Sequence, residues 1–263
     1  MHGYADHING FDDLLSGFAR RGILCTGVDQ RGWGQSIRTE ADRGNSGPTP
    51  LVLADVASFI EAQLDAEPTD IPVFVMGHSM GGQLVATLAS LPEYTPLVSR
   101  LAGIMLYAPW IGLSDEVVIS PVTLFACRWV RLLFPRYQTV LAVPPAQALR
   151  SQAKQEAAVT NPYANTTVTL ETLGDAINRG KDLDSGKLVL CADGVKSLYL
   201  AHGTGDKTTS HDASLRWYDS QTGRVPDRKF KSYEGFAHAA HVDFPEDAQA
   251  LLDDCAEWIL ERS

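Results

Sequence analysis

Apolar and polar residues follow two alternating patterns along the first 109 residues. Apolar residues recur at helical spacing over 11–18, 51–64 and 83–89, and short apolar runs typical of buried strands cover 23–28, 72–76 and 101–107. Strands that alternate with helices in this way indicate a parallel sheet flanked by helices. The sequence therefore predicts an α/β fold.

The alternation stops at residue 110 and resumes near residue 196. Residues 110–195 contain helical patterns, the clearest at 117–134 and 170–177, and no convincing strand. A strand at 197–201, a helix at 210–220, a strand at 228–233 and a helix at 245–260 follow. We therefore expect a core made of residues 1–109 and 196–263, with residues 110–195 inserted as a helical cap over the carboxyl edge of the sheet.

Composition and net charge exclude several classes of function. The 263 residues carry a net charge of −10, which argues against nucleic acid as a partner. The four cysteines have no short spacing, so neither a metal site nor a disulfide framework is expected, and no apolar run reaches the 18 residues of a membrane span. We expect a cytoplasmic protein. The sequence leaves open whether the protein attaches peripherally to membranes or lipid droplets, and whether a targeting signal precedes residue 1.

A nucleophile elbow is predicted where the run 72–76 meets the helical pattern. The segment between them reads Gly77-His78-Ser79-Met80-Gly81. Strand, sharp turn and helix form the context in which Gly-x-Ser-x-Gly presents a reactive serine. We expect Ser79 to have a strained backbone, and Gly77 and Gly81 to lack side chains because these would collide.

A serine nucleophile needs a base, and the base needs an acid that orients it. Asp206 lies in the loop directly after the strand at 197–201, which makes it the preferred acid. Asp115 starts the cap, Asp193 precedes a strand and Asp212 lies inside a helix, so these three aspartates are weaker candidates.

His238 follows the strand at 228–233 and is the preferred base, with His241 as its rival. The two histidines could also be a metal pair, but no third ligand has a sensible spacing, so no metal is predicted. For the oxyanion hole we expect the backbone N–H groups of Met80 and Tyr4, because His2-Gly3 is the only such pair before the elbow.

At these residues the chain resembles the monoglyceride lipase group of α/β-hydrolases. The matching pieces are His2-Gly3-x-x-x-His7, Asp29-x-Arg31-Gly32-x-Gly34-x-Ser36, Gly77-His78-Ser79-Met80-Gly81-Gly82, Asn161-Pro162, Gly203-x-x-Asp206 and Tyr233-Glu234-Gly235-x-x-His238. Their order and approximate spacing agree over nearly the whole chain.

The resemblance implies an α/β-hydrolase fold and cleavage of monoacylglycerols or related long-chain esters without a cofactor. It implies Ser79 as nucleophile, Asp206 as acid, His238 as base, and Tyr4 and Met80 as oxyanion donors. A carboxylesterase or a lysophospholipase would use the same residues, and an inactive truncated hydrolase that serves only as a binding module is a third possibility.

The cap carries a basic and apolar stretch. Residues 117–155 contain five basic residues and no acidic one, and aromatic and leucine residues stand among these charges at 125–134. A basic amphipathic surface of this kind suits a lipid interface, so we expect residues 117–137 to contact membranes. The alternative is that these apolar residues pack the cap onto the core.

The resemblance also places a strand immediately before His2, in the sheet between residues 23–29 and 72–76. Only Met1 precedes His2, so we expect a truncated chain that lacks its N-terminal strands. Such a chain should have a slot between those segments or a pairing that closes it. Tyr4 should then be mobile, and the protein poorly soluble and nearly inactive.

Overall fold

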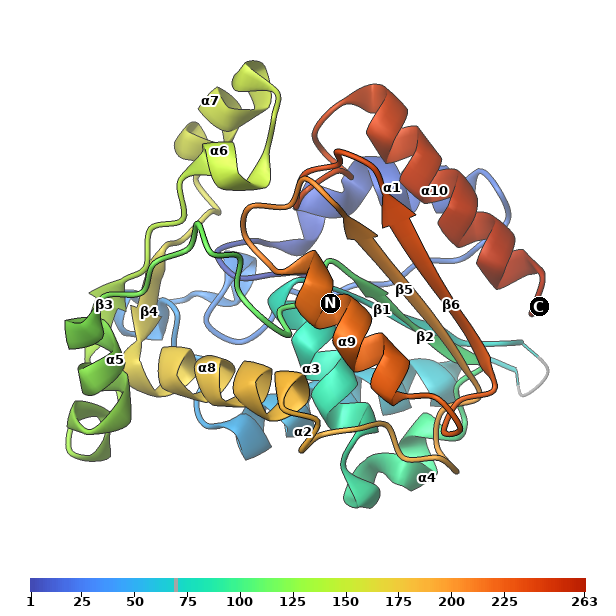
Figure 1. The fold of residues 1–263 in the computed structure, drawn as a ribbon, viewed down its shortest axis with the longest axis horizontal. Helices are drawn as coiled ribbons and strands as arrows, with labels where there is room; N and C mark the ends of the chain where they lie inside the picture. The colour runs from blue at the N-terminus through green and yellow to red at the C-terminus, as the bar shows by residue number, and fades with distance from the viewer. Residues whose placement is uncertain (69–70) are drawn as a thin grey trace.

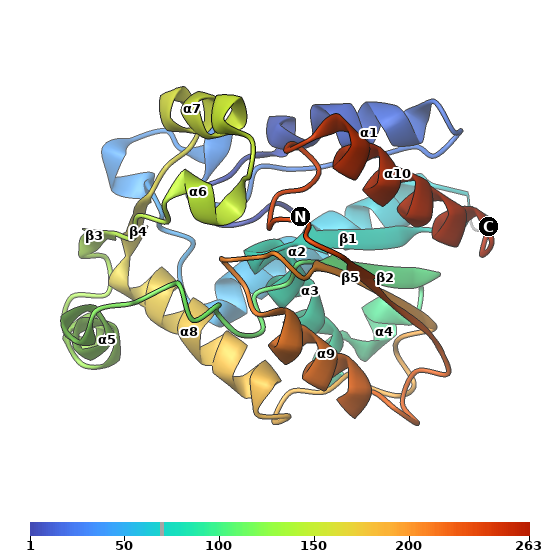
Figure 2. The ribbon, with the colours of Figure 1, turned by 45° about the horizontal axis from the view of Figure 1, so that its top comes forward.

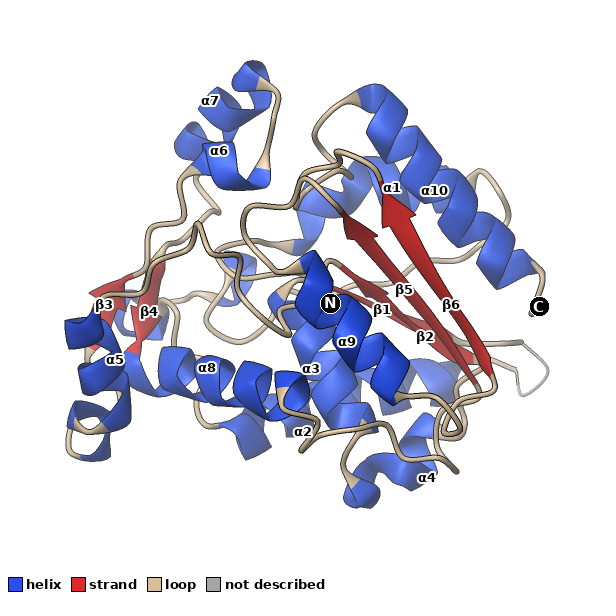
Figure 3. Ribbon diagram, viewed as in Figure 1, coloured by secondary structure: helices blue, strands red, loops and turns tan. Residues whose placement is uncertain are grey.

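A parallel sheet lies at the centre of the computed structural model, which describes residues 1–68 and 71–263. Within these residues the sheet has four strands in the order β1-β2-β5-β6, and helices lie on both of its faces (Figures 1 and 3). The strands are β1 (Phe74–His78), β2 (Gly103–Tyr107), β5 (Ser197–Gly203) and β6 (Asp227–Tyr233). All neighbouring pairs are parallel, so the carboxyl ends of the strands, where catalytic loops are expected, meet at one edge.

The helices of the core agree closely with the sequence prediction. They are α1 (Asp12–Ala19), α2 (Thr49–Ala66), α3 (Met80–Ala89), α4 (Thr95–Val98), α9 (His211–Ser220) and α10 (Pro245–Leu260). Short 3-10 turns add Ile8–Phe11, Gly34–Ser36, Glu40–Asp42 and Pro92–Tyr94. The predicted helices at 51–64 and 245–260 are thereby confirmed as α2 and α10.

The apolar core has two parts, one on each face of the sheet. Ile104 and Leu106 of β2 pack with α2, α3 and α9, whereas Met105 and Tyr107 pack with α1 and α10. Side chains of a strand alternate between its two faces, so a strand that is covered on both sides is apolar throughout. This double covering explains why 101–107 reads as a continuous apolar run.

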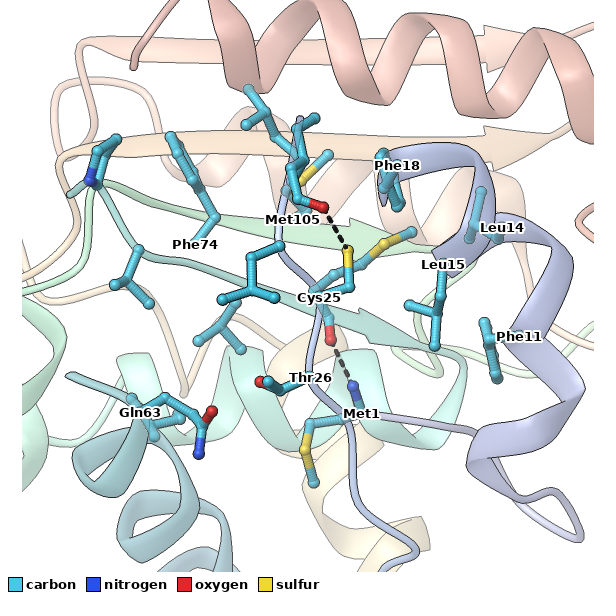
Figure 4. A pocket seen from close by; sticks show the side chains of 18 of the residues that line it. Met1, Phe11, Leu14, Leu15, Phe18, Cys25, Thr26, Gln63, Phe74 and Met105 are labelled. Atoms are coloured by element: carbon cyan, nitrogen blue, oxygen red, sulfur yellow. Dashed lines mark hydrogen bonds between the residues drawn. The ribbon is translucent and has the colours of Figure 1, made fainter. Parts of the chain in front are cut away.

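Residues 23–28 do not form a strand, and this prediction was wrong. A strand requires a hydrogen-bonding neighbour, and a cavity of about 460 Å³ lies between this segment and β1. Figure 4 shows Leu14, Leu15 and Phe18 of α1, Phe74 of β1 and Cys25 among the side chains around it. The slot expected between these segments is therefore present, and it leaves Phe74, Val75 and Met76 only half-buried while β2 is fully buried.

Met1 lies at the end of this cavity next to the elbow. Its backbone nitrogen donates to Met76 O (2.6 Å), and His78 N donates to Met1 O (3.0 Å). These two bonds have the pattern of a parallel strand pair. They fix the start of the loop that passes over Ser79.

Residues 110–195 begin on the side of the sheet toward which the strands point and return along α3 to the start of β5, where Cys191 N donates to Ala89 O (Figures 1 and 2). They form α5 (Pro121–Arg128), a 3-10 turn (Val130–Leu132), α6 (Pro145–Ala148), α7 (Gln152–Thr160) and α8 (Leu170–Asp184). They also contain an antiparallel pair, β3 (Gln138–Val140) and β4 (Thr167–Thr169), where the sequence predicted no strand. Three-residue strands 27 positions apart are too short to leave an alternating pattern.

α8 belongs as much to the core as to the inserted segment. Gln83 of α3 donates from its amide nitrogen to Ala176 O of α8 (2.9 Å) and to Trp110 O (2.8 Å). Its amide oxygen accepts from the buried Arg179 guanidinium at 3.1 Å. These bonds fasten α8 to the helix that starts at the nucleophile. Among the described helices, none combines the length and apolar character that crossing a membrane requires.

Candidate active site

Ser79 lies between β1 and α3 in a conformation that L-residues seldom adopt. Its φ is 53° and its ψ is −119°. A Cβ on Gly77 would lie 2.5 Å from Gly81 O, and a Cβ on Gly81 would lie 2.4 Å from Met1 O. The strained serine and the two obligatory glycines are therefore present as predicted for a nucleophile elbow.

Asp206 and His238 form a tight buried pair. His238 Nδ1 lies 2.7 Å from Asp206 Oδ2, and the carboxylate also accepts from the N–H groups of Thr208 (2.7 Å) and Thr209 (2.9 Å). Burial raises the pKa of Asp206, but the imidazole of His238 and the bonds from His202 and His238 hold it well below its usual range. Asp206 is thus an ionised acceptor that orients the His238 ring.

Two glycines allow the loops after β5 and β6 to meet. A Cβ on Gly203 would lie 2.2 Å from Phe236 O, and a Cβ on Gly205 would lie 2.7 Å from Gly235 O. Thr204 N also donates to Tyr233 O at 2.9 Å. The glycines of the Gly203-x-x-Asp206 pattern therefore permit the close approach of backbones that brings Asp206 to His238.

His241, the rival base, makes no bond to Asp206 in the described structure. Its ring stacks on Phe11, with ring centroids 4.2 Å apart and an interplanar angle of 8°. His78 lies between the two candidates, because its Nε2 is 3.2 Å from His238 O and its ring is 5.0 Å from that of His241. The geometry thus joins His238, and not His241, to the acid.

The Ser79 hydroxyl has no hydrogen bond to His238 within the part of the chain that the structure describes. Ser79 and His238 are 6% and 5% exposed, and the ring of His78, which precedes Ser79, lies 4.7 Å from that of His238. Catalytic hydrogen bonds are often long in the absence of substrate, so this geometry is compatible with a serine that is activated when substrate binds.

The loop His2–Tyr4 lies directly against the nucleophile. A Cβ on Gly3 would lie 3.0 Å from Ser79 Cβ and 3.5 Å from Ser79 Oγ. Across the described residues, no hydrogen bond uses the N–H of Tyr4 or of Met80. These two groups, the predicted oxyanion donors, are therefore available to a ligand.

Tyr4 is held in place, contrary to the mobile position expected from the sequence. Its hydroxyl lies 2.9 Å from Leu141 O and 2.7 Å from Thr166 O, and its ring packs edge-on against Trp33. The neighbouring His2 accepts from Gln30 N at 2.9 Å through Nε2. The segment after Met1 is thus tied both to the core and to the inserted segment.

A second histidine, His202, also contacts Asp206. Its side chain is fully buried, its Nε2 lies 3.0 Å from Asp206 Oδ2, and its Nδ1 lies 2.9 Å from Ser214 Oγ. Burial lowers the pKa of His202, although the hydrogen bond to Asp206 opposes this effect. Two histidines therefore share one carboxylate oxygen. The position of His202 one residue before Gly203 was the available signal for this contact in the sequence.

A family model described as "Serine aminopeptidase, S33" matches residues 1–244. The chain belongs to this family. It is 27% identical over 277 residues to the monoacylglycerol lipase of Mycolicibacterium smegmatis, which covers 99% of this chain and 86% of that protein. It is also 27% identical over 273 residues to the caffeoylshikimate esterase of Arabidopsis thaliana, with 99% and 76% of the two chains covered.

Solved structures are similar over the whole chain. A soluble variant of the monoglyceride lipase from Saccharomyces cerevisiae, solved with a substrate analog, superposes with a TM-score of 0.88 at 18% identity. The match covers 100% of this chain and 85% of that one. The predicted α/β-hydrolase fold and the resemblance to monoglyceride lipases are therefore confirmed, and the chain is a hydrolase of the lipase and esterase type.

Proposed function

We propose that this chain is a serine hydrolase that cleaves carboxylic esters of lipids, with monoacylglycerol as its substrate. The observation that carries the proposal is the Asp206–His238 pair, joined at 2.7 Å, beside a serine held at a φ of 53°. These are the parts that an activated serine needs. The similarity to monoglyceride lipases supports the choice of ester.

In the proposed reaction, Ser79 Oγ attacks the ester carbonyl and its proton passes to His238 Nε2. Asp206 accepts from His238 Nδ1 and stabilises the imidazolium, while the N–H groups of Tyr4 and Met80 donate to the oxyanion. His238 then protonates the departing glycerol oxygen, which leaves the acyl group on Ser79. Water, deprotonated by His238, releases the fatty acid and restores the serine. The chemistry requires no cofactor.

A surface of the inserted segment suits a lipid interface. Seven large apolar side chains of residues 117–134 are at least half exposed, which goes against the alternative that they pack the cap onto the core. This surface, which we call the lid face, consists of Val118, Val122, Phe125, Trp129, Leu132, Leu133 and Phe134. Contiguous exposed apolar side chains commonly mark binding sites for membranes or other partners. We propose that residues 110–195 act as a lid that attaches to the lipid surface.

Two arginines that stand among the residues of the lid face, Arg128 and Arg131, have different surroundings. Arg131 pairs with Asp175 at 2.5 Å and is only 21% exposed, so it holds the 3-10 turn Val130–Leu132 against α8. Arg128 stacks over the Trp129 ring at 5.1 Å and has no carboxylate partner among the described residues. Arg128, rather than Arg131, is therefore free to contact anionic lipid.

The test of the substrate is hydrolysis of monoacylglycerols of increasing chain length, compared with a short soluble ester and a lysophospholipid. We expect long-chain monoacylglycerols to have the highest kcat/KM and Ser79→Ala to abolish all turnover. Preference for the short ester would favour a carboxylesterase, and preference for the lysophospholipid would favour a lysophospholipase. No turnover by the folded wild-type chain would favour a binding module.

The test of the lid face is sedimentation with anionic phospholipid vesicles. Leu133→Ser combined with Phe134→Ser should weaken binding about tenfold, because two exposed apolar side chains no longer enter the interface. Val159→Ser is the matched control, since Val159 is equally exposed but lies on α7. Equal binding by all variants would refute the role of the lid face, whatever the enzymatic activity.

A further inference from the structure

Asp6, His78 and His241 form a polar cluster next to the catalytic residues that the proposed reaction does not use. A carboxylate oxygen of Asp6 and one ring nitrogen of each histidine all lie within 4.8 Å of one another. The three residues come from the loop before α1, the end of β1 and the loop after β6. The sequence therefore could not supply the third ligand that a metal site at His241 requires.

Two of these side chains carry buried nitrogens without a partner. His78 is 5% exposed and His241 is 4% exposed, and in the described structure Nδ1 of each makes no hydrogen bond. The other nitrogen of His78, Nε2, lies 3.2 Å from His238 O and can only donate there, which makes Nδ1 an acceptor with a free lone pair. Buried polar atoms are normally satisfied, so such an atom calls for a ligand.

The third side chain, Asp6, is a carboxylate that has no lysine or arginine partner among the described residues. It accepts from its neighbour His7 N at 2.8 Å. Burial raises the pKa of Asp6 to about 6 and lowers that of His241 to about 3. At neutral pH the cluster thus offers one carboxylate and two neutral imidazoles, which are the forms that bind metal ions.

We propose that Asp6, His78 and His241 bind a divalent transition-metal ion, with Zn²⁺ as the reference ion. Two imidazole nitrogens and one carboxylate form a known zinc ligand set, and buried charges are commonly paired or metal-bound. Ligand atoms around tetrahedral Zn²⁺ lie about 3.3 Å apart, so the ligand atoms, which all lie within 4.8 Å of one another, need to approach by at most about 1.5 Å. Water would complete the coordination.

A metal at this position should inhibit ester hydrolysis. The His78 ring lies 4.7 Å from that of His238, so the cation would sit beside the base that must become positively charged during the reaction. Like charge at this distance disfavours the imidazolium. The inhibition rests on the proposed function, whereas the binding of the metal does not.

The test is a titration of the chelator-treated, full-length protein with Co²⁺ and Zn²⁺. The wild-type chain should give the intense visible absorption of four-coordinate Co²⁺ at one equivalent, and Zn²⁺ should displace it with a Kd of about 1 µM. Asp6→Asn and His241→Gln should each weaken binding by more than about tenfold. His211→Gln removes a histidine that lies 2.8 Å from Ser232 Oγ and outside the cluster, and should bind as the wild type does.

The wild-type titration alone can overturn the proposal, even if a variant does not fold. Absence of the Co²⁺ band, or of Zn²⁺ binding up to about 1 mM, refutes the site. Undiminished binding by folded Asp6→Asn or His241→Gln also refutes it. A chain that hydrolyses esters but binds no metal refutes only this inference, whereas a chain that binds Zn²⁺ but hydrolyses nothing refutes only the proposed function.

Discussion

Replacing Asp206 by asparagine should abolish activity through the tautomer of His238. The oxygen of the new amide would take the two backbone N–H bonds at 2.7 Å and 2.9 Å from Thr208 and Thr209, which leaves its NH₂ group facing His238 Nδ1. His238 must then accept at Nδ1 and carry its proton on Nε2. A protonated Nε2 cannot remove the proton of Ser79.

The expected loss is about 10⁴-fold in kcat, or about 5.5 kcal/mol of transition-state stabilisation. The assay is hydrolysis of a p-nitrophenyl ester at pH 7.5, with thermal melting to confirm that the variant is folded. Asp115→Asn and Asp212→Asn are matched controls, since both aspartates were candidates from the sequence and neither contacts His238. An Asp206→Asn enzyme that keeps more than about a tenth of the wild-type kcat would refute the triad.

Two further predictions concern the other histidines. Burial lowers the pKa of His2 to about 4 and of His241 to about 3, so only the unfolded chain is protonated as pH falls below about 6.5. Together, the two histidines should lower the folding free energy by about 4 kcal/mol between pH 7.5 and 5, and Asp6, whose pKa burial raises to about 6, should return about 1.4 kcal/mol. Urea unfolding at pH 7.5 and 5 should show the net loss, and constant or rising stability would contradict it. His202→Phe removes one hydrogen-bond donor to Asp206 and should lower kcat by about 10- to 100-fold at unchanged KM. His202→Gln can still donate to Asp206 and should restore part of the activity. Equal effects of both substitutions would mean that His202 only fills space.

Sequence reasoning succeeded where a structure is determined locally. The elbow at Ser79 and the helices α2, α9 and α10 depend on neighbouring residues, through backbone sterics and helical periodicity. The segment 23–28 has a strand-like composition, but whether it forms a strand depends on a partner elsewhere in the chain. The cavity beside β1 leaves it without one.

The finer features of the site were beyond sequence reasoning for a related reason. His202 reaches Asp206, and Asp6 reaches His78 and His241, only because separate loops meet at one edge of the sheet. No spacing along the chain encodes these distances. The exposure of the lid face is likewise a property of packing, because the same apolar pattern would suit a helix buried against the core.

The most direct test of the account is labelling of the purified chain with a fluorophosphonate probe, which reacts only with an activated serine. We expect one adduct per chain on the peptide that contains Ser79, with no adduct in Ser79→Ala and much slower labelling in His238→Ala. A folded wild-type chain that remains unlabelled, or labelling that persists in Ser79→Ala, would contradict the assignment of Ser79 as the nucleophile.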